Sequence, residues 1–125
     1  MSKVYQIPDV TQTITTTETD VIFIGVQDVI GRSFFLINDG AVDLTYKVYA
    51  SPSGVVTGDK DNVGNTLTAA QIAKEWEVQT AITGTVAAGV SASVNVSSVM
   101  LKYIKLSAYT SSGSTTLKAY AQKII

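Results

Sequence analysis

The chain has 125 residues, 46% of them hydrophobic and 15% charged, with a net charge of −1, which predicts one folded domain and excludes a disordered chain. Its nine Lys and Arg residues are scattered and form no basic patch for nucleic acid, and no apolar run reaches the roughly 20 residues that cross a membrane. Because cysteine and histidine are absent, disulfides, thiolate or His-bound metals and Ser-His-Asp triads are excluded, so we expect neither an enzyme nor a cofactor.

Short segments that alternate apolar and polar residues are separated by turn residues along most of the chain, a pattern typical of β-strands. Residues 1–9 are expected to form a short N-terminal arm. In the Thr-rich segment 10–19, Val10 and Ile14 share one side. Residues 21–26, VIFIGV, are continuously apolar, which predicts a central strand covered on both faces.

Two more strands are expected before a long loop. Residues 33–37, SFFLI, form one strand, and residues 38–40, NDG, supply a turn with no further role. Residues 44–51, LTYKVYAS, form the next strand, whose expected inward side holds Leu44, Tyr46, Val48 and Ala50. Residues 51–65 are Gly-rich and polar, and loops of this length are either functional or mobile.

One stretch departs from the strand pattern. In residues 67–76, LTAAQIAKEW, Thr68 and Gln71 have the spacing of a capping box, and the residues that follow favour a helix. We expect a short helix of about two turns. It would lie across an end of the sandwich and dock Ile72, together with Trp76.

The last third of the chain returns to alternation. Residues 75–86, EWEVQTAITGTV, predict a strand that ends near Gly84. Residues 90–97, VSASVNVS, predict a strand with an inward side of Val90, Ala92, Val94 and Val96. Residues 102–120, KYIKLSAYTSSGSTTLKAY, predict a closing hairpin with an inward side of Ile104, Leu106, Ala108, Leu117 and Ala119. The prediction is therefore an all-β, antiparallel β-sandwich, jelly-roll or immunoglobulin-like, of about eight strands with one short helix, in a single domain over 1–125.

Acidic residues suggest two sites, each with a simpler explanation. Asp59, Asp61 and Asn62 offer oxygen ligands for a hard cation such as Ca²⁺, but the bidentate Glu of an EF-hand loop is missing, and a solvated turn explains them better. Glu75 and Glu77 flank the only tryptophan, as acids do in some glycosidases. A position at the rim of a strand explains this pair equally well, so no catalytic residue is assigned.

The outward side of the predicted strands is rich in tyrosine. These residues can pack across strands, or they can form a partner surface, since Tyr buries a large area at low entropic cost. Small Ser, Thr, Ala and Asn residues around them leave a flat surface that another subunit can approach. The interface candidates, all expected on the one face opposite the aliphatic alternation, are Tyr49, Tyr103, Lys105, Tyr109, Lys118 and Tyr120.

The order of these segments carries a resemblance. A Thr-rich first strand is followed by the NDG turn before LTYKVYAS, a Gly-rich loop, a Trp-containing strand, VAAGVSASVNV (86–96) and the terminal YIKLSAYTSSGSTTLKAYAQK. In this order the chain resembles the small β-sandwich proteins of tailed-phage virions, which are auxiliary capsid proteins or tail and fibre components. The resemblance implies a noncatalytic structural role, often as a trimer or a lattice-bound copy, and carries over no functional residue.

The leading hypothesis is a virion structural protein, a capsid decoration or auxiliary protein that binds the particle through a sandwich face or edge. Its partners would be other virion proteins and copies of itself, a trimer first, because few charges protect the strand edges. The start of the chain lacks a secretory signal, so we expect synthesis in a host cytoplasm and residence in the virion. The alternative is a carbohydrate-binding module that stacks sugars on Tyr103, Tyr109 or Tyr120; a surface-layer subunit is a third option.

Overall fold

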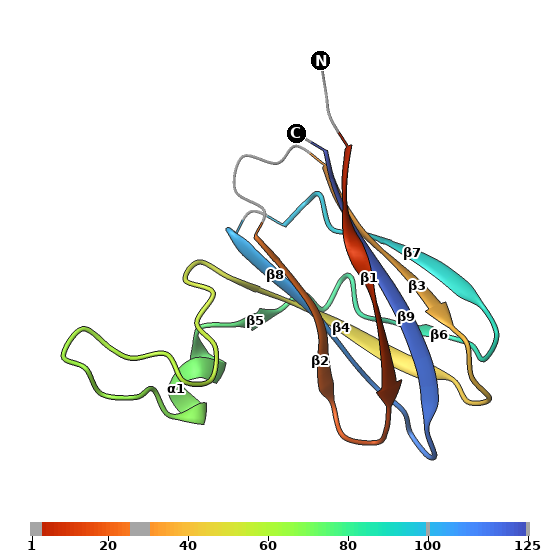
Figure 1. Cartoon of the computed structure of the whole chain (residues 1–125), viewed down its shortest axis with the longest axis horizontal. Helices are drawn as coiled ribbons and strands as arrows, with labels where there is room; N and C mark the ends of the chain where they lie inside the picture. The colour runs from red at the N-terminus through yellow and green to blue at the C-terminus, as the bar shows by residue number, and fades with distance from the viewer. Residues whose placement is uncertain (1–3, 26–30, 100, 125) are drawn as a thin grey trace.

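The computed structural model describes residues 4–25, 31–99 and 101–124, and over these ranges the chain forms two antiparallel sheets and one short helix (Figure 1). No helix of the described part is long and apolar enough to span a membrane. The elements are β1 (Val4–Ile14), β2 (Thr19–Gly25), β3 (Gly31–Asn38), β4 (Leu44–Ser51), α1 (Ala69–Lys74), β5 (Glu77–Val78), β6 (Gly84–Val86), β7 (Ser91–Asn95), β8 (Tyr103–Tyr109) and β9 (Thr115–Ile124).

The two sheets divide the strands almost evenly. Sheet A has the strand order β1-β9-β3-β7, and sheet B has the order β2-β8-β4-β5, with β6 also paired to β4. Every pairing in both sheets is antiparallel. The sheets face one another as a sandwich, which confirms the predicted fold class.

The core lies between the sheets and is built from alternate residues of each strand. Ile104 and Leu106 of β8 and Leu117 and Ala119 of β9 are fully buried, as their alternation predicted. Phe34 and Leu36 of β3 and Val48 of β4 join them, also at 0% exposure. Burying each such large aliphatic or aromatic side chain contributes about 1.5–3 kcal/mol, so this layer holds the sheets together.

Asn38, at the end of β3, does more than form a turn. Its side chain is fully buried, and its amide donates to the carbonyl oxygens of Val42 (2.9 Å) and Val86 (3.0 Å). Its Oδ1 accepts a bond of 2.5 Å from the Thr115 hydroxyl. The side chain thus joins β3, the loop before β4, β6 and β9 at one end of the sandwich. The sequence prediction, which gave this residue only a turn role, was incomplete.

Two predictions for the first strands were wrong. Residues 21–25 belong to β2, which is an edge strand of sheet B rather than a central strand, and Phe23 is 43% exposed. Residue 26 lies outside the described ranges. The expected arm over 1–9 is part of β1 from residue 4 onward and pairs with β9. The pairing shifts register between Ile7 and Val10, where Pro8 has no N–H to donate.

Three predictions for the later strands also need correction. The single strand expected over 75–86 is two short strands, β5 and β6, which both pair with β4 on either side of a turn. Val90, expected inward, is 48% exposed because it lies in the turn before β7, where its N–H donates to Ala87. Both strands of the expected closing hairpin form, but they do not pair with each other. β8 belongs to sheet B and β9 to sheet A, so the loop between them crosses from one sheet to the other (Figure 1).

The predicted helix is present, with its capping box. The Thr68 side chain accepts from the Gln71 N–H, and the Gln71 side chain accepts from the Thr68 N–H. The helix does not lie across an end of the sandwich, because none of its residues is buried and it sits beside β5, on the outer side of sheet B (Figure 1). Trp76, just after it, is the residue that docks.

Candidate functional site

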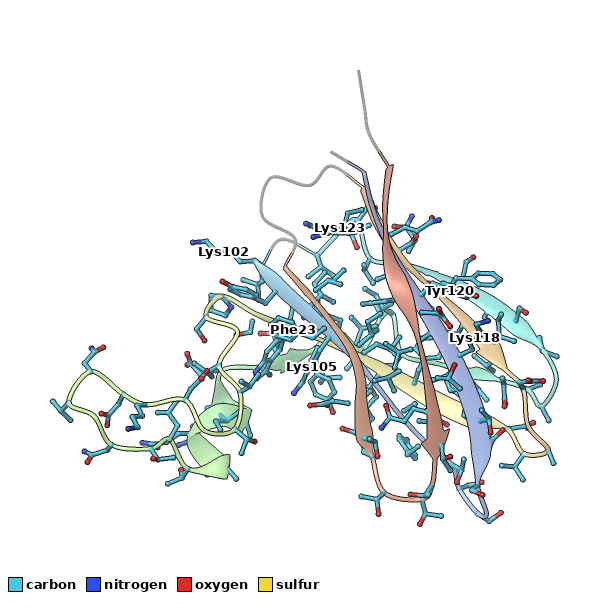
Figure 2. The ribbon with its side chains drawn as sticks, in the orientation of Figure 1. Phe23, Lys102, Lys105, Lys118, Tyr120 and Lys123 are labelled. Atoms are coloured by element: carbon cyan, nitrogen blue, oxygen red, sulfur yellow. The ribbon has the colours of Figure 1, made fainter. Side chains whose placement is uncertain are left out.

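The predicted interface residues lie on two opposite surfaces, not on one. Tyr49, Tyr103, Lys105 and Tyr109 lie on the outer face of sheet B, whereas Lys118 and Tyr120 lie on the outer face of sheet A (Figure 2). The prediction of one face was therefore wrong, because β8 and β9 belong to different sheets. All six side chains are half-buried. We call the two surfaces the sheet B face, made of Phe23, Lys47, Tyr49, Tyr103, Lys105 and Tyr109, and the sheet A face, made of Ser33, Phe35, Ile37, Ser93, Lys118, Tyr120 and Gln122.

Lys105 lies at the centre of the sheet B face, between two aromatic rings. Its ammonium is 4.6 Å from the ring centroid of Trp76 and 5.4 Å from that of Tyr49. It also lies 3.4 Å from a carboxylate oxygen of Asp20. Cation–π contacts of this kind contribute about 0.5–1 kcal/mol at exposed sites and more where water is excluded. The positive charge of Lys105 is thus held within the face rather than offered to a partner.

Tyr49 is tied to the start of β2. Its hydroxyl donates to Glu18 at 2.8 Å, and the same carboxylate lies 3.4 Å from the Lys47 ammonium. Burial raises the pKa of Tyr49 to about 12, and the hydrogen bond to Glu18 and the negative charges of Glu18 and Asp20 act in the same direction. Because the phenol stays protonated near neutral pH, Tyr49 acts here as a hydrogen-bond donor.

Trp76 fastens the long excursion between β4 and β5 onto the sheet B face. The ring is 7% exposed, its Nε1 donates to the Val55 carbonyl at 2.9 Å, and it meets Phe23 edge to face at 5.7 Å. Tyr103 packs on Phe23 at 5.8 Å and against Gly54, where an added Cβ would lie 2.7 Å from the tyrosine ring. Segment 51–76 therefore covers part of this face, where it contacts Phe23, Tyr103 and Lys105.

The sheet A face has a different composition. At its centre the rings of Phe35 and Tyr120 lie 6.4 Å apart, and Phe35 is 42% exposed. A shallow depression of about 400 Å³ beside them is lined by Ser33, Phe34, Phe35, Ile37, Ser93, Tyr120 and Gln122. Lys118 lies over the Tyr120 ring at 5.5 Å and 3.8 Å from Asp9. The face is thus an aromatic centre among small polar side chains.

The acidic loop uses its carboxylates on its own backbone. Asp59 accepts from the Val56 N–H at 2.9 Å, and Asp61 accepts from the N–H groups of Val63 and Asn65 at 3.0 and 2.9 Å. These bonds, that from Asn65 foremost, lower the pKa of Asp61. Within the described ranges no three His, Cys, Asp or Glu side chains gather as a metal site. Turn formation accounts for Asp59 and Asp61, and the exposed Asn62 adds no further evidence for a cation.

The acids beside Trp76 are separated by their surroundings. Glu75 ends α1 and accepts a hydrogen bond of 2.8 Å from the Ser53 hydroxyl, whereas Glu77 is exposed in β5. The residues that the sequence analysis missed are aromatic: Phe23, on the edge strand of the sheet B face, and Phe35, at the centre of the sheet A face. One signal was available for Phe35, because Phe34 and Phe35 are adjacent in a strand and must point to opposite sides.

Comparisons with known proteins show the fold and no family. No family model matches the chain, and no curated protein matches it. Among solved structures, it is similar to the protein of "Bacillus endospore appendages", disulfide-linked pili, with a TM-score of 0.57 and 16% identity over 99% of this chain and 88% of that one. PirA has a TM-score of 0.50 and 14% identity, over 95% of this chain and 90% of PirA. The SPBc2 prophage-derived protein YomS has a TM-score of 0.45 and 11% identity, over 98% of this chain and 95% of YomS. At these identities the likeness concerns the fold alone, and the third is too distant to argue from.

Proposed function

We propose that the protein is a noncatalytic structural subunit that is built into a larger particle, and that this particle is a tailed-phage virion on which it serves as a capsid decoration protein. The observation that carries the proposal is the sheet A face, where Phe35 is 42% exposed next to Tyr120 and small polar residues surround the pair. Protein interfaces have this composition, with aromatic residues in the centre, few charges and a polar rim.

The fold likeness supports an assembly role. The Bacillus appendage protein, which has a similar fold, belongs to appendages that form pili, so a similar architecture serves in at least one assembly. Those pili are described as disulfide-linked, whereas this chain has no cysteine. Its contacts with neighbours would therefore be noncovalent, as they are for a protein added to a finished capsid.

The geometry favours a structural role over carbohydrate binding. The three tyrosines that the sequence suggested as a sugar platform are divided, with Tyr103 and Tyr109 on one face and Tyr120 on the other. The Tyr103 ring is also packed between Phe23 and Gly54. The three tyrosines therefore cannot form the single sugar platform that the sequence suggested.

The test is addition of the purified protein to capsids that lack it. The genes beside its own, such as those for a portal, a terminase or a major head protein, identify the capsid to use. We expect the protein to sediment with these capsids at a fixed, saturating number of copies per particle, and not with capsids of an unrelated phage. If no copies bind at about 10 μM while a glycan array gives clear signals, the proposal is wrong and the carbohydrate-binding alternative replaces it.

A further inference from the structure

The two outer faces of the sandwich differ in what covers them. On the sheet B side, Trp76 and the excursion that carries it pack on Phe23 and Lys105. In Figure 1 this excursion and α1 lie on the side of β5, and within the described ranges no comparable segment lies over sheet A. Figure 2 shows Lys118 and Tyr120 on the side of the molecule away from the excursion. Phe23 and Phe35 are about equally exposed, at 43% and 42%, but the sheet A face is the one over which no other described segment packs, and it is therefore the better candidate for contact with another molecule.

We infer that the sheet A face is the docking surface for a second copy of this chain, related to the first by a two-fold axis that passes near Phe35. This inference rests on the proposed function, because it names the contact through which a structural subunit meets its neighbour. A two-fold contact places the same patch on both sides, so the patch must complement itself in charge, area and shape.

The charges of the face meet this requirement. At the centre of the face, the charged residues that the structure describes are Lys118 and the neighbouring Asp9, whose ammonium and carboxylate lie 3.8 Å apart. At the margin of the face, Arg32 lines a second depression with Ser33 and Ser93, and its Nε donates to the Val96 carbonyl at 3.2 Å. Lys118 and Asp9 balance one another, so two copies can meet over Phe35 without like-charge repulsion at the centre of the contact.

The area of the face is sufficient for a small specific contact. Four strands about 4.8 Å apart, each contributing roughly six residues at 3.3 Å, give a face of about 19 by 20 Å, or roughly 400 Å² in projection per copy. Side-chain relief raises the accessible area to roughly 500–600 Å², so the two copies together bury about 1,100 Å². This is the lower end of specific interfaces, which includes many transient contacts, so we expect a reversible dimer.

The shape of the face also allows a symmetric contact. The depression beside the Phe35–Tyr120 pair is about 400 Å³, and the small side chains of Ser33 and Ser93 form its polar side. An axis near Phe35 brings each copy's ring to the other copy's depression. The exposed area of Phe35 is then removed from water twice, once in each subunit.

Phe23 provides a matched control for the test. It is also a phenylalanine on an outer sheet face, and it is 43% exposed, nearly the same as Phe35 at 42%. Sedimentation velocity and light scattering of the full chain from about 2 to 200 μM measure the dimer. We expect Phe35→Ser to raise the dissociation constant at least tenfold and Phe23→Ser to change it less than about twofold. Far-UV circular dichroism confirms that each variant is folded.

Several results would overturn the inference. A monomer at 200 μM, equal weakening by Phe23→Ser, or the trimer expected from the sequence would each exclude the two-fold contact through the sheet A face. An open-ended series of masses abolished by Val63→Ser would show instead that the exposed loop tip contacts the next copy, since Val63 is 81% exposed.

The outcome is separable from that of the proposed function. If the protein binds its capsid and Phe35→Ser leaves the mass distribution unchanged, the inference fails and the proposed function stands. If the wild type is monomeric and Phe35→Ser abolishes capsid binding, the face belongs to the virion partner, which again overturns only the inference. If capsid binding fails while the dimer forms as described, the surface is right and the virion role is wrong.

Discussion

Replacing Asn38 with alanine removes three hydrogen bonds from a fully buried side chain at the end of β3. The carbonyl oxygens of Val42 and Val86 lose their donor, and the Thr115 hydroxyl loses its acceptor. A buried polar group left without a partner costs about 1–3 kcal/mol. The hydrogen bond to the Val42 carbonyl is only partly buried, so in the variant a water molecule can donate to this oxygen in place of the Asn38 amide. We therefore expect the free energy of unfolding to fall by about 2–4 kcal/mol.

Urea unfolding measures this loss with two independent probes. Far-UV circular dichroism follows the sheets, and the fluorescence of the single tryptophan follows the cover on sheet B. With a urea slope of about 1–3 kcal/mol per molar, the midpoint should fall by roughly 0.7–4 M. Asn62→Ala, the same change at an exposed loop position, is the control and should stay within about 0.5 kcal/mol of the wild type. A loss of less than 1 kcal/mol for Asn38→Ala would refute the reasoning that this side chain joins the sandwich end.

Three further predictions follow from the same contacts. Gly40→Ala should destabilise the fold by at least about 2 kcal/mol in urea unfolding, because the added Cβ would clash with the Thr115 side chain and lie 2.9 Å from the Thr115 Cα. Trp76→Ala should leave the sheet signal in circular dichroism unchanged while limited proteolysis within the excursion accelerates at least tenfold; equal cleavage rates would show that Trp76 does not hold the cover. The folded pKa of Tyr49 is raised to about 12 from an ordinary value near 10, so its stabilisation is complete below pH 10 and is lost as pH rises toward 12. Between pH 9 and pH 11 the free energy of unfolding should therefore fall more for the wild type than for Tyr49→Phe. Equal losses in the two proteins would show that this assignment is wrong.

The features that the sequence predicted correctly depend on near neighbours. The alternation in β8 and β9 places Leu106 and Leu117 in the core because successive residues of a strand point to opposite sides. The capping box at Thr68 needs only a partner three residues away, and both of its hydrogen bonds form. The two-layer β architecture could therefore be predicted from local periodicity and turn residues alone.

The features that were predicted incorrectly depend on distant segments. The apolar run in β2 suggested a central strand, but Phe23 meets Trp76, which arrives from the other end of the long excursion. An apolar run shows that both sides of a strand are covered, and it does not show whether a sheet, a helix or a loop is the cover. Asn38 was misjudged for the same reason, because its partners Val86 and Thr115 are far away in the chain.

The division of the tyrosines between two surfaces follows from one choice in the topology. After Tyr109 the chain could have turned back beside β8 in the same sheet, and the residues 111–114, SSGS, suit a hairpin as well as a crossing. The chain crosses instead because β9 then pairs with β1 along one edge and with β3 along the other. Each of its ten residues has a partner in at least one of these strands, whereas pairing with β1 alone would leave one edge of β9 open. Once β9 lies in sheet A, the same alternation that turns Tyr103 outward on one side turns Tyr120 outward on the other. Segment 51–76 packs on only one of these sides. The position of β9 in sheet A, which the sequence did not predict, therefore leaves Phe35 and Tyr120 as a separate surface on the other side.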